Sequence, residues 1–156
     1  MKYWLLKSEP DAYSYSDLES APNQRTLWDG VRNYQAAKLL KNEMQVGDLA
    51  FFYHSSCKVP AVVALCRITR TGITDPTSLD PQSRYYDPKS SAEQPRWITV
   101  EVAADTPLPR AVSLKELKQQ PELQDMVLLK NGRLSVQPVS PQQWQFILQL
   151  AHDGSH

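Results

Sequence analysis

The sequence predicts an α+β fold, a small mixed β-barrel of about five to six strands with short helices at its periphery. The length of 156 residues fits one domain that can bury a core. Residues 49–54 and 61–68 are apolar at nearly every position, which is typical of strands buried on both faces. Short strand-like and helix-like segments alternate along the rest of the chain. We therefore expect a single domain at residues 1–152 and a tail at residues 153–156.

The N-terminal segment predicts a strand followed by a short helix. Residues 2–6 are rich in aromatic and branched side chains, and residues 8–11 end this strand with turn-forming types. Ser14 or Ser16 can cap a short helix through residues 17–19.

The next segment predicts one helix and the two central strands. Residues 21–32 contain Pro, Asn and Gly and are expected to be irregular. Asn33 is a plausible N-cap for an amphipathic helix at residues 34–44. The strands at residues 49–54 and 61–68 follow, joined by a polar loop.

The C-terminal half begins with a long connection. Residues 74–96 carry four prolines and no periodicity, so we expect a loop that is functional or mobile. Strands are expected at residues 97–102 and 134–137, with a short helix at residues 114–119 between them. Ser140 predicts the N-cap of a last helix, because Pro141 suits the first helical position.

The composition excludes several classes of protein. The 17 basic and 17 acidic residues cancel, which argues against strong non-specific binding of duplex nucleic acid and for local recognition. No apolar run is long enough to span a membrane, and the N-terminus has no secretory signal, so a cytoplasmic location is expected. Cys57 and Cys66 are expected to be reduced and structural. No metal site or cofactor motif is visible.

Catalysis has weak support in the sequence. Phosphate-binding loops, dinucleotide motifs and nucleophile elbows are missing. His54 is the one histidine expected in structured surroundings, and Ser55 or Ser8 could serve as its nucleophile. Adjacent residues of a strand point to opposite faces, however, so His54 and Ser55 would not meet readily.

Aromatic and polar side chains in irregular segments favour a binding site for a single base. Trp28 precedes Gly30, which permits close backbone approach, and a helix N-terminus at Asn33 offers free amide donors. A base outside a duplex is typically stacked on an aromatic ring and hydrogen-bonded along its Watson–Crick edge. Residues suited to these roles are Trp28, Arg32, Asn33, Tyr34, Tyr53, His54, Ser55 and Trp97.

Several of these residues have a structural alternative. Trp28 can fill the core instead of contacting a ligand, and Trp97 can belong either to the core or to the pocket. Asn33 can simply cap its helix. Arg32 can form an ion pair with Asp29 or Asp87. Tyr85 and Tyr86 can form a lid over a ligand or anchor the long loop. The aromatic residues that we assign to the core are Trp4, Phe51, Phe52 and Trp144.

The chain resembles the EVE domain family, whose folds are related to those of PUA and YTH domains. The resemblance covers about residues 2–151, and its motifs lie at residues 3–10, 28–36, 47–55 and, in the long loop, 85–89 with 95–97. It implies a PUA-like barrel with a concave pocket, recognition of modified bases in DNA or RNA, notably modified cytosine, and no enzymatic activity. By this resemblance Trp28 and Trp97 would form the pocket walls and Ser8 its rim. The residues around the base would be Arg32, Asn33, Tyr34, His54 and Ser55.

Three functions follow as hypotheses. The first is a nucleic-acid-binding module that holds a modified base in an aromatic pocket, with a possible protein partner that supplies strand binding or effector activity. The second is a protein–protein adaptor that uses the proline-rich loop at residues 74–95. The third is a hydrolase or other nucleotide-processing enzyme centred on His54.

Overall fold

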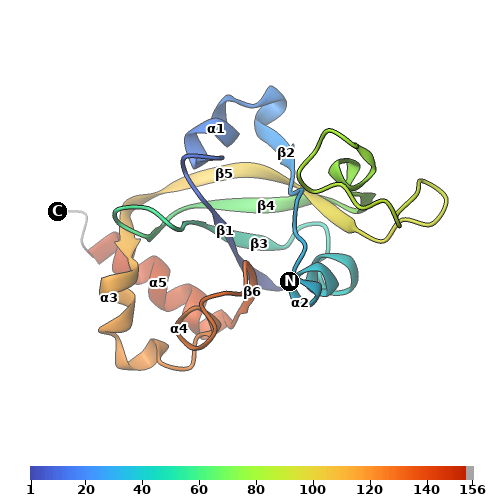
Figure 1. Cartoon of the computed structure of the whole chain (residues 1–156). Coiled ribbons are helices and arrows are strands. Elements are labelled where there is room, and N and C mark those ends of the chain that lie inside the picture. Colours follow the sequence, from blue (N-terminus) through green and yellow to red (C-terminus); the bar gives the residue numbers. More distant parts are fainter. Residues whose placement is uncertain (154–156) are drawn as a thin grey trace.

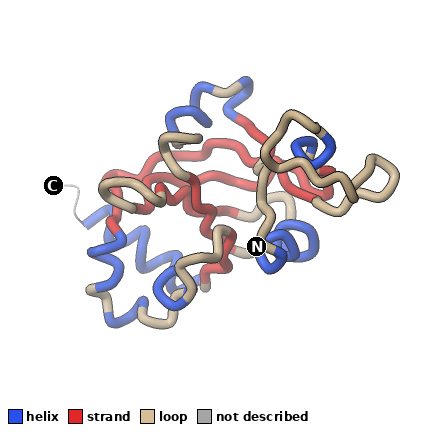
Figure 2. The backbone as a smooth tube through the Cα atoms, in the orientation of Figure 1, coloured by secondary structure: helices blue, strands red, loops and turns tan. Residues whose placement is uncertain are grey.

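The computed structural model describes residues 1–153 and contains one mixed sheet (Figures 1 and 2). Its strands are β1 (Tyr3–Ser8), β2 (Arg25–Leu27), β3 (Leu49–His54), β4 (Ala61–Thr74), β5 (Ile98–Ser113) and β6 (Val136–Val139). They lie in the order β2-β5-β4-β3-β1-β6. Strands β1 and β3 are parallel, whereas the other neighbours are antiparallel. The α+β class and the number of strands agree with the sequence prediction.

The sheet is open, so the closed barrel that the sequence predicts is not confirmed. Among the described residues, β2 pairs with β5 and β6 pairs with β1, and no ladder joins β2 to β6. Both edge strands are short, and Pro138 of β6 has no N–H group to offer to a further strand. These edges leave the sheet without the partner that closure requires.

Helices cover both faces of the sheet (Figure 1). They are α1 (Tyr15–Ser20), α2 (Tyr34–Lys38), α3 (Leu114–Lys118), α4 (Val127–Lys130) and α5 (Pro141–Asp153). Short 3-10 turns lie at Pro22–Gln24, Pro76–Leu79 and Pro121–Leu123, and a π-helical turn at Leu39–Glu43 continues α2. Helices α1 and α2 lie against one face of the sheet, and α3, α4 and α5 against the other.

Two hydrophobic clusters confirm that the central strands are buried on both faces. Phe52 points into one cluster with Trp4 and Trp28, whereas Phe51 points into the other with Trp144. Phe51 and Trp144 stack with ring centroids 4.0 Å apart. The four aromatic residues assigned to the core are thus correctly placed.

Several strand predictions are wrong in extent. Strand β4 continues to Thr74 beyond the predicted end at residue 68, and β6 covers Val136–Val139 instead of residues 134–137. Residues 21–32 are not wholly irregular, because β2 pairs with β5 there. Strand β5 continues to Ser113, far beyond the predicted end at residue 102. It tolerates Pro107 because β2 reaches only as far as Ala103 on the other side, so that at Pro107 strand β5 is paired with β4 alone.

The predicted helix caps are confirmed, and Cys66 is buried in β4 as expected. Asn33 accepts a hydrogen bond from the Ala36 N–H at 3.0 Å, and Ser140 accepts one from Gln143 at 3.1 Å. Of the predicted tail, Asp153 belongs to α5, and residues 154–156 lie outside the described residues. The domain boundary at residue 152 stays a prediction.

Candidate functional site

A cavity of about 760 Å³ opens beside Trp28, and we call it the Trp28 cavity. Its volume lies within the range of roughly 300–1,000 Å³ that small-molecule sites occupy. It is bounded by the ends of β1 and β3, by β2 and the segment that follows it, by the long loop before β5 and by the turn before β6. Of the predicted site residues, Ser8, Trp28, Arg32 and Ser55 line it.

The five other predicted residues lie outside this lining. Tyr53 points into the opposite hydrophobic cluster, His54 packs under α1, and Asn33 caps α2. Tyr34 and Trp97 stack on each other beyond Arg32. The slot that the sequence analysis expects between Trp28, His54 and Trp97 is therefore not observed, since only Trp28 of these three borders the cavity.

Trp28 is a wall of the cavity and a core residue at once. Its side chain is 8% exposed, and its ring meets Phe52 edge to face at 5.6 Å. The Thr99 hydroxyl donates a hydrogen bond to the Trp28 carbonyl, and the Trp28 N–H bonds to Val100. The backbone of Trp28 is thus fixed by strand β5, and its indole packs in the core while it borders the cavity.

The segment after Trp28 is fixed by Asp75, which the sequence analysis did not identify. Asp75 is 2% exposed and accepts hydrogen bonds from the Gly30 N–H at 2.9 Å and from the Arg32 guanidinium at 3.0 Å. Thr77 donates to it through both its N–H and its hydroxyl. Burial alone would raise the pKa of Asp75, but these hydrogen bonds from Thr77, Gly30 and Arg32 hold it below its ordinary value. The predicted ion pairs of Arg32 with Asp29 or Asp87 are wrong, because Asp75 is the partner.

Tyr85 connects the long loop to this segment. Its carbonyl accepts two hydrogen bonds from Arg32, and its ring packs against Gly30, where an added Cβ would come within 2.7 Å of it. Gly30 has a φ of +79°, so a side chain would also be strained there. Tyr85 therefore anchors the long loop, as one of its two alternatives predicts, and it also lines the cavity.

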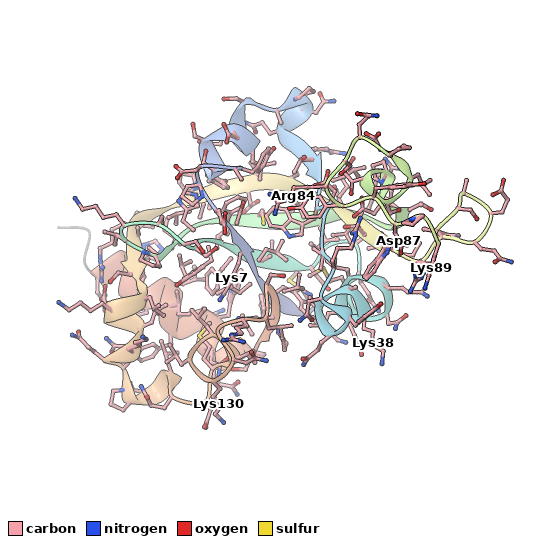
Figure 3. All side chains as sticks on the ribbon, in the orientation of Figure 1. Lys7, Lys38, Arg84, Asp87, Lys89 and Lys130 are labelled. Atoms are coloured by element: carbon pink, nitrogen blue, oxygen red, sulfur yellow. The ribbon has the colours of Figure 1, made fainter. Side chains whose placement is uncertain are left out.

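The cavity carries more positive than negative side chains, although the whole chain is neutral. Lys7, Arg32, Arg84 and Arg133 line it, against Glu9 and Asp29. Figure 3 shows Lys7 and Arg84 near the middle of the face that it draws. Arg32 is paired with Asp75, whereas Lys7, Arg84 and Arg133 form no ion pair with any residue from 1 to 153.

Two ionisable groups of the cavity have shifted pKa values. Burial lowers the pKa of Lys7, whose ammonium donates a hydrogen bond to the Gly132 carbonyl. Burial and the neighbouring Asp75 charge raise the pKa of Asp29. Arg32 opposes this shift but does not cancel it. The charged form of Asp29 is therefore less stable than that of an exposed aspartate, and this side chain lines the cavity wall.

His54 is held by the backbone rather than by a nucleophile. Its Nε2 accepts a hydrogen bond from the Tyr15 N–H at 3.2 Å, and its ring meets Phe52 edge to face. Burial lowers the pKa of His54, which favours the neutral ring that this contact needs. Ser8 donates its hydroxyl to the Tyr13 carbonyl, so it is not directed at the imidazole. His54 and Ser8 are therefore not paired as a base and a nucleophile, and the arrangement does not support the hydrolase hypothesis.

Residues 1–153 offer neither a metal site nor a membrane-spanning helix. No group of three His, Cys, Asp or Glu side chains is placed to hold a metal ion. No helix in this part of the chain has the length and apolar character needed to cross a bilayer.

A family model for the EVE domain matches residues 2–150. The chain belongs to the EVE domain family. Thymocyte nuclear protein 1 of Danio rerio is 39% identical to this EVE domain over 167 residues, which cover 96% of the chain and 72% of that relative. The human thymocyte nuclear protein 1 is 38% identical over 165 residues and covers 95% of the chain and 73% of that relative.

Solved structures match the fold of this EVE domain throughout. A hypothetical protein from Leishmania major has a TM-score of 0.93 and 41% identity, with 100% of this chain and 98% of that chain covered. Human THYN1 protein, solved in complex with 5-methylcytosine-containing DNA, has a TM-score of 0.92 and 36% identity, with 97% and 98% covered.

Several residues that line or support the Trp28 cavity were not among the predicted site residues. Tyr85 was considered only as a lid or a loop anchor, because its contact with Gly30 could not be read from spacing. Tyr13, Arg84 and Arg133 come from three distant segments with no shared pattern. Asp75 precedes Pro76, which predicts a turn but gives no sign of a buried carboxylate.

Proposed function

We propose that this EVE domain binds nucleic acid that carries a modified cytosine, most directly DNA, and that the modified base enters the Trp28 cavity. The observation that carries the proposal is this cavity, which has an aromatic wall and a surplus of cations in a chain of zero net charge. The likeness to human THYN1 in complex with 5-methylcytosine-containing DNA supports the choice of ligand.

The chemistry of the lining suits cytosine. Cytosine presents an exocyclic amino group, for which aspartate and glutamate are the usual acceptors. Asp29 and Glu9 provide carboxylates in the cavity, and Ser8 and Ser55 provide hydroxyls. Thymine has an acceptor where cytosine has its amino group, so it would face Asp29 without a hydrogen bond.

The cations suit the sugar-phosphate backbone around an extruded base. Lys7, Arg84 and Arg133 come from β1, the long loop and the turn before β6, so they border the cavity from different sides. Three phosphate contacts would give a modest salt dependence, with a slope of log affinity against log salt of about −2 to −3. Recognition would thus rest on the base and its neighbouring phosphates rather than on a long duplex.

A binding experiment with a plugged cavity tests the proposal. Oligonucleotides that differ only in one 5-methylcytosine are titrated against the wild type, Ser55→Phe and Ser20→Phe. Ser55 lines the cavity, whereas Ser20 is exposed at the end of α1. We expect the wild type and Ser20→Phe to prefer the methylated strand and Ser55→Phe to lose this preference.

Equal binding of methylated and plain strands by the wild type would overturn the proposal. Matched RNA strands decide between the two polymers in the same titration. The cytoplasmic location and an additional protein partner stay predictions of the sequence.

A further inference from the structure

An exposed aromatic stack lies next to the Trp28 cavity, and the proposed function gives it no role. Tyr34, the first residue of α2, is 68% exposed, which is unusual for so large a ring. It stacks on Trp97, with centroids 5.3 Å apart and planes inclined by 22°. We call this pair the Tyr34–Trp97 stack.

The stack is rigid. The Trp97 indole N–H donates a hydrogen bond to Asp87 at 2.8 Å, and the Arg32 guanidinium carbon lies 4.8 Å from the Trp97 ring centroid. Arg32 is itself tied to Asp75. Trp97 is only 7% exposed, so Tyr34 is the member of the stack that faces solvent. Tyr34 stacks on this fixed indole with one face of its ring, and a flat aromatic ring of this kind can stack a base.

The surroundings of the stack are cationic. Lys38 lies one turn after Tyr34 on the same face of α2, and Lys89 and Arg96 flank Asp87 in the long loop. Figure 3 shows Lys38, Asp87 and Lys89 at the same end of the molecule. Arg96 is paired with Asp87, but Lys38 and Lys89 form no ion pair among the described residues. This arrangement suits a base whose phosphates lie beside it.

The stack and the cavity share Arg32. The same guanidinium lines the Trp28 cavity and packs against Trp97. A strand that places one base in the cavity would therefore pass the Tyr34–Trp97 stack with a neighbouring nucleotide.

We propose that the Tyr34–Trp97 stack is a second base subsite, on which an unpaired nucleobase next to the modified cytosine stacks. The proposal rests on the proposed function for its ligand. Stacking on an aromatic side chain tolerates any base, because every base has a π face. The subsite thus adds affinity for the strand and leaves recognition of the modification to the cavity.

The test combines Tyr34→Ala with removal of the neighbouring base. The affinities of the wild type, Tyr34→Ala and Tyr34→Phe are measured for a single-stranded oligonucleotide with one 5-methylcytosine. They are measured again for strands with an abasic site at each position beside it. We expect Tyr34→Ala to lose about 5- to 150-fold in affinity for the intact strand. Tyr34→Phe keeps the ring and binds like the wild type.

The decisive result is the loss of additivity. Where the neighbouring base is missing at the stacking position, the wild type falls to the affinity of Tyr34→Ala, and the substitution then has no further effect. If Tyr34→Ala loses the same affinity with and without that base, or loses none, the second subsite is refuted. Tyr34 then only shields Trp97 from solvent.

The two proposals fail separately. If the wild type prefers the methylated strand but Tyr34→Ala is neutral, only the second subsite is lost. If the wild type shows no preference for the methylated strand but the non-additive loss of affinity persists, the stack binds a base. The proposal that the cavity recognises the modified base is then refuted. No binding of any strand by the wild type removes both.

Discussion

Among conservative substitutions in the loop before β5, Asp75→Asn is expected to lower the free energy of unfolding the most. Asp75 Oδ2 accepts from the Gly30 N–H and from Arg32, while Oδ1 accepts from the Thr77 N–H and hydroxyl. The asparagine amide has one oxygen, so its NH₂ group faces either the two donors of Gly30 and Arg32 or the Thr77 N–H, whose neighbouring hydroxyl can turn to accept. One or two hydrogen bonds to a charged acceptor are lost, at roughly 1.5–3 kcal/mol each, and the remaining ones lose the charge of the acceptor. Because the Arg32 side chain is 23% exposed and can recruit water, we expect a loss of about 3–4 kcal/mol.

Urea unfolding of the wild type, Asp75→Asn and Asp105→Asn measures this loss. Asp105 forms an ion pair with Arg67 at 3.3 Å in which the two side chains are 35% and 42% exposed. Such a surface pair contributes less than about 1 kcal/mol. A loss for Asp75→Asn within about 1 kcal/mol of the loss for Asp105→Asn would refute the view that Asp75 holds the cavity wall together.

Three further predictions concern the backbone, a histidine and the charge of the cavity. Gly30→Ala and Gly47→Ala, both at positive φ, should each lose about 1–2 kcal/mol of folding free energy through backbone strain. Gly30→Ala should lose more and should also weaken base binding, because its Cβ would come within 2.7 Å of the Tyr85 ring, whereas a Cβ at Gly47 meets no atom within 4 Å. Equal binding by the two variants would contradict this. The pKa of His54 is lowered by burial, so its stabilising effect is complete above about pH 6.5 and is lost as the pH falls toward its value in the folded chain. Between about pH 7.5 and pH 5, urea unfolding should therefore show a larger loss for the wild type than for His54→Gln, and parallel losses would disprove the assignment. Arg84→Gln should make the salt slope of strand binding shallower by about 0.7–0.9, whereas Lys118→Gln on α3 should leave the slope unchanged.

The parts of the fold that obey local rules could be predicted from the sequence. Asn33 and Ser140 cap helices because their side chains accept the free amides of the first turn, and this needs no tertiary information. Strands β3 and β4 reveal burial on both faces by their continuous apolar runs. The length of β5 was missed because prolines normally end a strand, and only the place of β5 in the sheet removes that constraint.

The candidate site could be predicted only in part, for a geometric reason. Ser8, Trp28, Arg32 and Ser55 reach the cavity because each lies at or near the end of a strand that borders it. Tyr53 and His54 are next to Ser55 in the chain, but strand alternation and the packing of α1 remove them from the cavity. Whether a side chain near a cavity also faces it depends on its partners across the fold, which spacing in the sequence does not encode.

The edge formed by β6 limits how this EVE domain can meet other proteins. An exposed strand with a full row of backbone groups invites another chain to extend the sheet, which leads to association or aggregation. Strand β6 has only four residues and carries Pro138, which cannot donate in such a ladder. A protein partner would therefore not gain a full ladder of backbone hydrogen bonds at this edge and would have to contact it through side chains.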